Sequence, residues 1–284
     1  MRRRSASLVA PAALLALFAA AIFLGAWVAP DPEALDLMAR LAPSSAAHPL
    51  GTDELGRDLL ARLLAGGRVS LIVAGATALL AAVIGTAIGL VAGYAGGRAD
   101  SLLMRLTDGV MALPLLPLLI VLAAVDPAKL GLPETVVGSE GFGIGRIVVI
   151  IAVVGWTTVA RLVRAATLSV KARDFVRAAV AVGVPPARIM LRHILPNVAS
   201  PVVVATTLSV GNIILVESAL SFLGLGLRPP ASSWGNMLTG AMDAVWTAPS
   251  LALWPGLAIF LTVLLFNLLG DGLQAAIDPR NDGN

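Results

Sequence analysis

Few side chains in this sequence have the type and spacing needed for chemistry. It has no cysteine, and its two histidines, His48 and His193, lie far apart without the spacing of a His-Glu-x-x-His metal motif. Lys129 in PAKL and Lys171 in VKAR do not follow the glycine-rich turn with which a P-loop holds phosphates. We therefore expect no catalytic residue, metal site or bound cofactor in this chain.

The composition is that of a membrane protein. Hydrophobic residues make up 58% of the 284 residues and charged residues 13%, and the mean hydropathy is +0.90. A soluble domain needs more polar surface than this to cover its core. The net charge of +3 is accordingly interpreted as a signal of membrane orientation and not of nucleic-acid binding.

Six apolar segments are long enough to cross a bilayer, which takes about 20 helical residues. They lie near residues 8–29, 69–95, 102–125, 146–168, 198–223 and 250–274. We expect an all-α protein of six transmembrane helices, the first one retained, because no compelling signal-peptide cleavage site follows it. The expected units are a tail with the first helix and the start of an external loop (1–45), an external amphipathic segment (46–68) and a core (69–279).

Basic residues orient these segments. Arg2, Arg3 and Arg4 precede the first span, and the connection from Arg161 to Pro196 carries seven basic residues against the single carboxylate Asp174. Because basic loops stay in the cytoplasm, we expect this connection and both chain termini on the cytoplasmic side.

The segment HPLGTDELGRD and the leucines after it predict a helix on the outer surface, with apolar and charged residues on opposite faces. We expect Thr52 to cap this helix, Gly66 and Gly67 to end it, and Asp58 to pair with Arg62. Alternatively, these charges contact another protein. The external-loop candidates are Asp53, Arg57, Asp58 and Trp234, and for Trp234 an interfacial aromatic anchor is the other interpretation.

The basic connection between the fourth and fifth spans has an ordered set of helix breakers. Residues 174–182 favour a short helix with small residues on one face, and Gly183 suits the left-handed position after it. Pro185 and Pro186 can start a second helix near residues 186–194, which Pro196 is expected to end. The pattern predicts a rigid helix-turn-helix that packs on its own spans or docks on a cytoplasmic partner.

Three stretches resemble one family of transport proteins. RAAVAVGVPPARIMLRHILP is similar to the EAA loop of ABC-importer permeases: Ala178, Ala179, Gly183, Leu195 and Pro196 match, whereas Arg177 and His193 replace the usual glutamate and isoleucine. HPLGTDELGRDLLARLLAGGRVSLIVA and ESALSFLGLGLRPPASSWGNML resemble the C-type permease of dipeptide and oligopeptide importers, and of the related nickel and glutathione systems.

This resemblance implies a type I importer permease in the bacterial cytoplasmic (inner) membrane. It would pair with a homologous second permease, two ATPase subunits that use ATP and magnesium, and an external substrate-binding protein. The residues implied to couple it to an ATPase are Arg177, Ala178, Ala179, Gly183, Pro185, Pro186, Arg188, Leu195 and Pro196. Peptides are the expected substrate, and nickel or glutathione is the alternative.

Charged residues inside apolar spans are functional candidates, because an unpaired charge in lipid costs several kcal/mol. Arg105 and Asp108 either form a local ion pair or serve the pathway or a subunit interface, and Glu217 is a candidate for a pathway or a partner helix. A self-sufficient secondary transporter remains a second hypothesis, although neither an inverted repeat nor mid-membrane ion ligands are evident.

Overall fold

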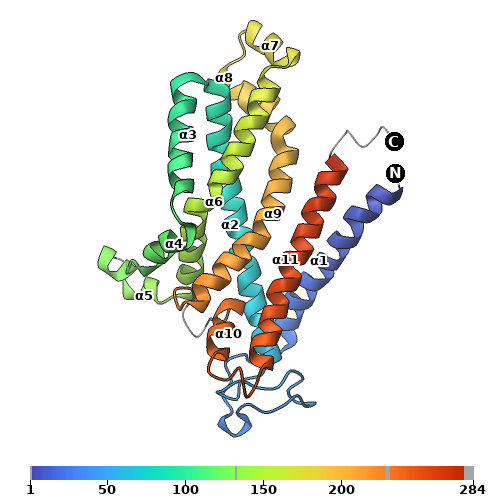
Figure 1. Cartoon of the computed structure of the whole chain (residues 1–284), viewed down its shortest axis with the longest axis vertical. Coiled ribbons are helices and arrows are strands. Elements are labelled where there is room, and N and C mark those ends of the chain that lie inside the picture. The colour runs from blue at the N-terminus through green and yellow to red at the C-terminus, as the bar shows by residue number, and fades with distance from the viewer. Residues whose placement is uncertain (1, 132, 228–230, 278–284) are drawn as a thin grey trace.

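A computed structural model of the chain describes residues 2–131, 133–227 and 231–277 (Figure 1). These residues are helical or irregular, without a strand. The α-helices are α1 (Arg2–Val28), α2 (Leu59–Ala95), α3 (Gly97–Ala112), α4 (Leu115–Ala124), α5 (Glu134–Val137), α6 (Glu140–Lys171), α7 (Asp174–Ala181), α8 (Pro186–Arg188), α9 (Leu195–Phe222), α10 (Trp234–Ala241) and α11 (Ser250–Ile277). Short 3-10 helices are η1 (Leu37–Ala39) and η2 (Pro127–Leu130), and η3 (Ile189–Ile194) is a π-helix.

Five helices of the described residues are long and apolar enough to cross a membrane, or six if the bent pair α3 and α4 forms one span. The expected third helix over residues 102–125 is wrong as a continuous element, because α3 and α4 meet at 87°. Pro114 is the physical reason. It has no N–H to donate, and it holds Leu113 in an extended conformation (φ −78°, ψ 139°) that ends α3.

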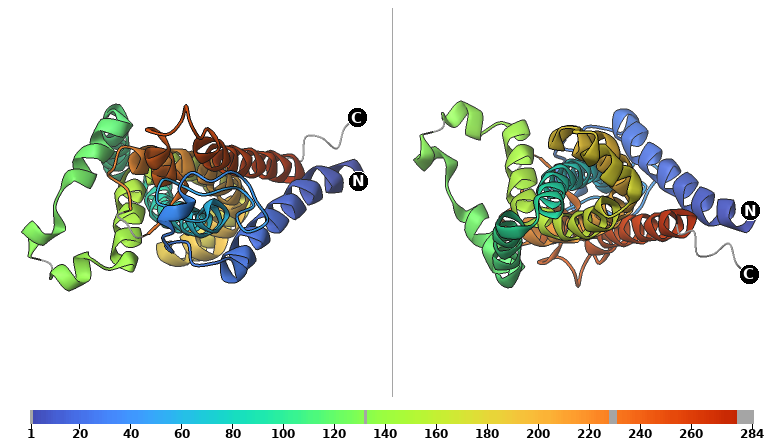
Figure 2. Two further views of the ribbon diagram at one scale, coloured as in Figure 1. Left: turned by 90° about the horizontal axis from the view of Figure 1, so that it is seen from below. Right: turned by 90° about the horizontal axis from the view of Figure 1, so that it is seen from above.

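The connections gather at two ends of the helical bundle. The turn between α2 and α3, α7, and both ends of the described chain lie in the upper part of Figure 1. The loop between α1 and α2, α5 and α10 lie in the lower part. Viewed along the long axis, α5 projects from the side of the bundle opposite the termini (Figure 2). This arrangement matches the even number of crossings that the sequence predicts.

Helices α2 and α6 make the most extensive contact of any two helices in the described part of the bundle. Gly85, Gly89 and Gly93 lie on the face of α2 that meets α6, where a Cβ atom at Gly85 would lie 2.6 Å from the carbonyl oxygen of Trp156. A Cβ atom at Gly89 would lie 2.5 Å from that of Ala160. The four-residue glycine spacing thus provides close helix contact, as in other membrane proteins, and the contacting helix lies within this chain.

The separate amphipathic helix expected before the second span is wrong. Thr52 does not cap it; Asp58 caps α2 by accepting a 2.7 Å hydrogen bond from the Ala61 N–H. The helix then continues through Gly66 and Gly67, so the expected boundary between units at residue 68 falls inside α2. Both glycines are close-packing sites, since a Cβ atom at Gly67 would lie 2.6 Å from the Trp234 ring. The expected end of the core at residue 279 lies outside the described residues.

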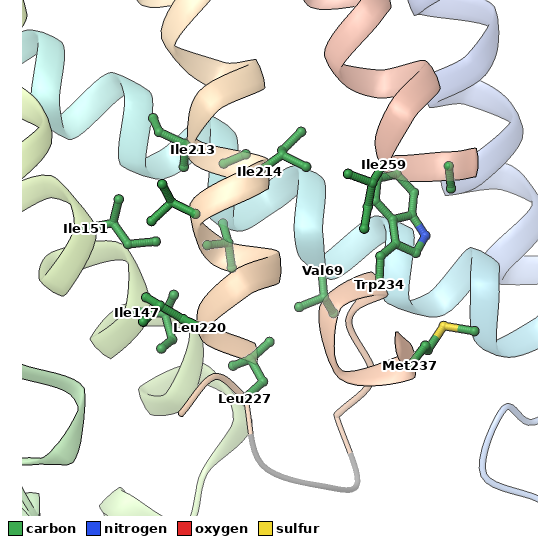
Figure 3. Close-up of a cluster of buried hydrophobic side chains, with 14 of the residues drawn as sticks. Val69, Ile147, Ile151, Ile213, Ile214, Leu220, Leu227, Trp234, Met237 and Ile259 are labelled. Carbon is green, nitrogen blue, oxygen red and sulfur yellow. The ribbon is translucent and has the colours of Figure 1, made fainter. Parts of the chain in front are cut away.

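The main hydrophobic core lies near the end of the bundle that carries α10. Trp234 and Met237 of α10 lie beside Ile259 of α11 and Val69 of α2 (Figure 3). Ser233 starts α10 through a capping box with Asn236. Because Trp234 is 0% exposed, the expected interfacial anchor is wrong: this side chain belongs to the core.

Candidate functional site

The α7 tip, defined as residues 172–188, is the most prominent projection at its end of the bundle (Figure 1). Helix α7 ends in a Schellman motif, in which the Val184 N–H donates to the Ala179 carbonyl and the Gly183 N–H to the Val180 carbonyl, both at 3.0 Å. Gly183 has φ +82°, a left-handed conformation that favours glycine. The predicted turn at Gly183 is confirmed.

Buried side chains fix the α7 tip to the bundle. Val176 of α7 is 1% exposed and packs in a second hydrophobic cluster with Ile189, Ile194 and Val198. Ala179 and Val184 pack against the same cluster from the tip. The tip is therefore an extension of the spans, so that its motion is expected to follow theirs.

The outer surface of the α7 tip combines apolar and basic side chains. Phe175 is 42% exposed, Val180 54% and Val182 83%. The exposed candidates of this surface are Arg177, Ala178, Gly183, Pro185, Pro186 and Arg188. Ala179 is half-buried on the cluster. Apolar groups of this size are left in water only singly or where a partner covers them.

The second helix of the tip does not stop at Pro196. It starts at Pro186 as expected, but α8, the π-helix η3 and α9 form one continuous helix from Pro186 to Phe222. Pro196 has no N–H, and the π turn just before it bonds the Leu195 N–H to the Met190 carbonyl. A π turn relaxes the hydrogen-bond ladder, which explains how the helix passes a proline. Leu195 packs half-buried on the second cluster, whereas Pro196 is exposed.

Ion pairs brace the spans below the tip. Arg164 of α6 makes two hydrogen bonds to the Asp100 carboxylate of α3, at 2.5 and 2.6 Å. Lys171 donates to the Tyr94 carbonyl oxygen and lies 5.3 Å from the centre of the Tyr94 ring. The expected local pair of Arg105 with Asp108 is wrong, because Asp108 pairs at 3.0 Å with Arg161 of α6. Both partners of that pair are more than half exposed.

Glu217 lies in the interior, where α2, α9 and α10 meet. Its side chain is 0% exposed, so it presents no surface to a pathway or to a partner helix. The Ser221 hydroxyl donates to Oε1 at 2.7 Å and the Ser70 hydroxyl to Oε2 at 3.2 Å. The Trp234 N–H donates to Ser70 Oγ at 3.3 Å. The carboxyl group therefore joins three helices through serine hydroxyls.

At the other end of the bundle, the candidates Asp53 and Arg57 form an ionic cluster with Arg62, in which Asp53 is buried and both arginines are half-buried. Asp53 accepts hydrogen bonds from the Arg57 N–H at 3.0 Å and Arg57 Nε at 2.8 Å, and it also pairs with Arg62. Burial raises the pKa of Asp53, but the Arg57 and Leu55 N–H groups and the charge of Arg62 outweigh it and lower that pKa. Arg62 thus pairs with Asp53 in place of the expected Asp58.

Asp58 instead accepts a 2.9 Å hydrogen bond from His48. Together these contacts tie the loop between α1 and α2 to the start of α2.

Comparison with known proteins places this architecture in a family. Residues 85–283 match the binding-protein-dependent transport system inner membrane component family. The chain belongs to this family.

A peptide permease protein of Brucella suis biovar 1 is 41% identical over 260 residues, which are 91% of this chain and 82% of that protein. A nickel transport system permease protein of Escherichia coli K12 is 38% identical over 254 residues, 89% and 87% of the two chains. The fold resembles a chain of the inward-facing MetNI methionine ABC transporter, with a TM-score of 0.57, 19% identity, and coverage of 76% of this chain and 96% of that chain.

The permease is therefore a multi-pass protein of the inner membrane. The sequence analysis did not predict the two hydrogen-bond donors to Glu217, which are Ser70 and Ser221. A signal was present for Ser221, since it follows Glu217 by one helical turn. Ser70 lies 147 residues earlier in the chain, and no local pattern joins the two positions.

Proposed function

We propose that this permease is the membrane subunit of an ATP-driven importer of peptides. It pairs with a homologous second permease to form the pathway, and it is driven by two cytoplasmic ATPase subunits and supplied by an external binding protein. ATP and magnesium act on the ATPase subunits. Its family supports the transport role, and the name of the Brucella suis relative supports the peptide substrate. The nickel relative leaves nickel complexes as the competing substrate, and glutathione is a further alternative.

The observation that carries this proposal is the α7 tip. It is anchored by Val176 on the cluster of the spans, and it presents exposed Phe175, Val180 and Val182. An ATPase that closes around such a tip moves the spans with it, because the tip and the spans share one packed cluster. Alternating access then follows from rocking of the helical bundle.

The orientation belongs to the same proposal. The α7 tip and both ends of the described chain lie in the same part of the bundle (Figure 1), and the tip carries Arg173, Arg177 and Arg188. Basic segments stay in the cytoplasm. We therefore place both termini in the cytoplasm and α10 outside.

Replacement of Gly183 tests the coupling role. Gly183→Val puts a β-branched residue at φ +82°, which costs about 1–3 kcal/mol of backbone strain and distorts the tip. Gly183→Asn is the matched control, because asparagine tolerates the left-handed region. No other atom lies within 4 Å of the new Cβ position in either variant.

We expect Gly183→Val to accumulate in the membrane but to lose substrate-stimulated ATP hydrolysis in vesicles that contain the whole transporter, with Gly183→Asn closer to wild type. Uptake of labelled dipeptides, a nickel chelate and glutathione by these vesicles identifies the substrate. Transport by the permease alone without ATP would refute the proposal.

A further inference from the structure

The α7 tip carries more positive charge than its surroundings neutralise. Between Arg161 and Pro196 the only carboxylate is Asp174. Arg173, Arg177 and Arg188 are exposed, and within the described residues none of them forms an ion pair. By contrast, Arg161 and Arg164 farther along the spans are paired with Asp108 and Asp100. Uncompensated charge thus gathers at the tip, whereas Arg98 and Arg105 of α3 and Arg192 of η3 are single exposed arginines outside it that also form no ion pair in the described part of the chain.

A groove beside α7 brings this charge next to apolar surface. Its lining includes Tyr94, Lys171, Val176, Arg177 and Val180. Lys171 is held in place by the Tyr94 carbonyl at 2.5 Å and by the Tyr94 ring. Arg177 lines the groove without a carboxylate partner in the described part of the chain. The groove thus has an apolar wall with one fixed cation and one free cation.

We infer that the α7 tip docks on an acidic surface of its ATPase, with an aspartate or glutamate of that subunit seated in the groove between Lys171 and Arg177. The inference rests on the proposed function and adds the chemistry of the partner. Charge complementarity indicates an acidic partner surface. A basic or neutral surface would leave the charges of Arg173, Arg177 and Arg188 unpaired, whereas the carboxylates of an acidic surface would pair with them. The exposed Phe175, Val180 and Val182 supply the apolar centre of the same contact.

Charge reversal at Arg177 tests this inference. The transporter with its ATPase subunits is placed in nanodiscs of neutral phosphatidylcholine, and the ATPase retained is measured as salt is raised. We expect Arg177→Glu to weaken ATPase affinity about tenfold or more, because like charges then face each other, and Arg177→Gln to have a smaller effect. Arg98→Glu is the matched control: Arg98 is an exposed arginine of α3 near the same end, outside the groove, and it should bind as wild type does.

Crosslinking identifies the seated residue. Because the sequence has no cysteine, Arg177→Cys carries a single site for a photoreactive maleimide, and the crosslinked peptide is identified by mass spectrometry. A peptide of the ATPase with clustered aspartate or glutamate supports the inference, and reversing its charge should restore binding to Arg177→Glu.

Three results would overturn the inference. The first is ATPase binding by Arg177→Glu as tight as that of wild type, and the second is a crosslinked peptide without acidic residues. The third is an effect of Arg177→Glu seen only in nanodiscs that contain anionic lipid, which would show that Arg177 binds lipid headgroups. Loss of coupling in Gly183→Val together with an unchanged Arg177→Glu would overturn this inference and leave the proposed function standing. A wild-type permease that retains no ATPase would overturn both.

Discussion

Glu217 shows how a single side chain can organise the end of a membrane bundle. A buried carboxyl group is costly unless its oxygens accept hydrogen bonds, and here Ser221 and Ser70 donate to the two oxygens. Ser70 also accepts from the N–H at the first residue of α10. The position of α10 against the spans thus depends on Glu217, a residue that the local sequence suggests would line the transport pathway.

Replacement of Glu217 is predicted to destabilise the permease. In Glu217→Ala the buried Ser70 and Ser221 hydroxyls lose their acceptor, which costs about 1–3 kcal/mol for each group left unsatisfied. Glu217→Gln keeps a carbonyl acceptor and a similar volume, so its loss should be smaller. The midpoint of thermal unfolding in detergent measures both. Equal midpoints for Glu217→Ala and wild type would show that the hydrogen bonds do not hold α10.

The elements show where sequence patterns suffice and where they fail. The glycine repeat of α2 predicts a close helix contact, and the structure finds α6 there. Pro114 and Pro196 look similar as helix breakers in the sequence, yet Pro114 breaks a span and Pro196 does not. The difference is tertiary: the turn before Pro196 is a π turn anchored by buried Ile189 and Ile194, whereas Leu113 before Pro114 is exposed.

The contact between α2 and α6 is predicted to depend on its glycines. Gly89→Ala places a Cβ atom 2.5 Å from the Ala160 carbonyl oxygen, and the overpacking should cost about 1–3 kcal/mol. Gly75→Ala in the same helix is the control, because no atom lies within 4 Å of its Cβ position. That control should gain about 0.5–1 kcal/mol of helix stability. Thermal unfolding of the purified variants compares them, and equal stability of the two would contradict a tight contact at Gly89.

At the scale of the whole molecule, the number of crossings and the gathering of connections at two ends are predictable, because apolar length and basic residues encode them. The side-chain contacts at the end that carries α10 are not predictable in this way. Buried Asp53 forms an ionic cluster with half-buried Arg57 and Arg62, and Trp234 of α10 packs against α2 in the core. Such contacts join segments that lie far apart in the chain, and the polar and aromatic residues that make them resemble ordinary loop residues in the sequence.

At the α7 tip the turn at Gly183 is predictable from the sequence, whereas the groove beside Arg177 is not, since Tyr94 in its lining comes from α2.

The orientation of the permease can be measured directly, because the sequence has no cysteine and a single introduced thiol gives an unambiguous signal. Ala46 is exposed in the loop between α1 and α2, and Val182 is 83% exposed on the α7 tip; these segments lie at opposite ends of the bundle (Figure 1). We predict that a membrane-impermeant maleimide labels Ala46→Cys in spheroplasts, from which the outer barrier has been removed. The same reagent should label Val182→Cys only after the inner membrane is opened, because basic segments remain in the cytoplasm.

Both side chains are small and exposed, so neither variant should disturb the fold. Labelling of both variants in opened membranes controls for the reactivity of the two thiols. Labelling of Val182→Cys in sealed spheroplasts would show that the permease has the opposite orientation, with the α7 tip outside and out of reach of a cytoplasmic ATPase.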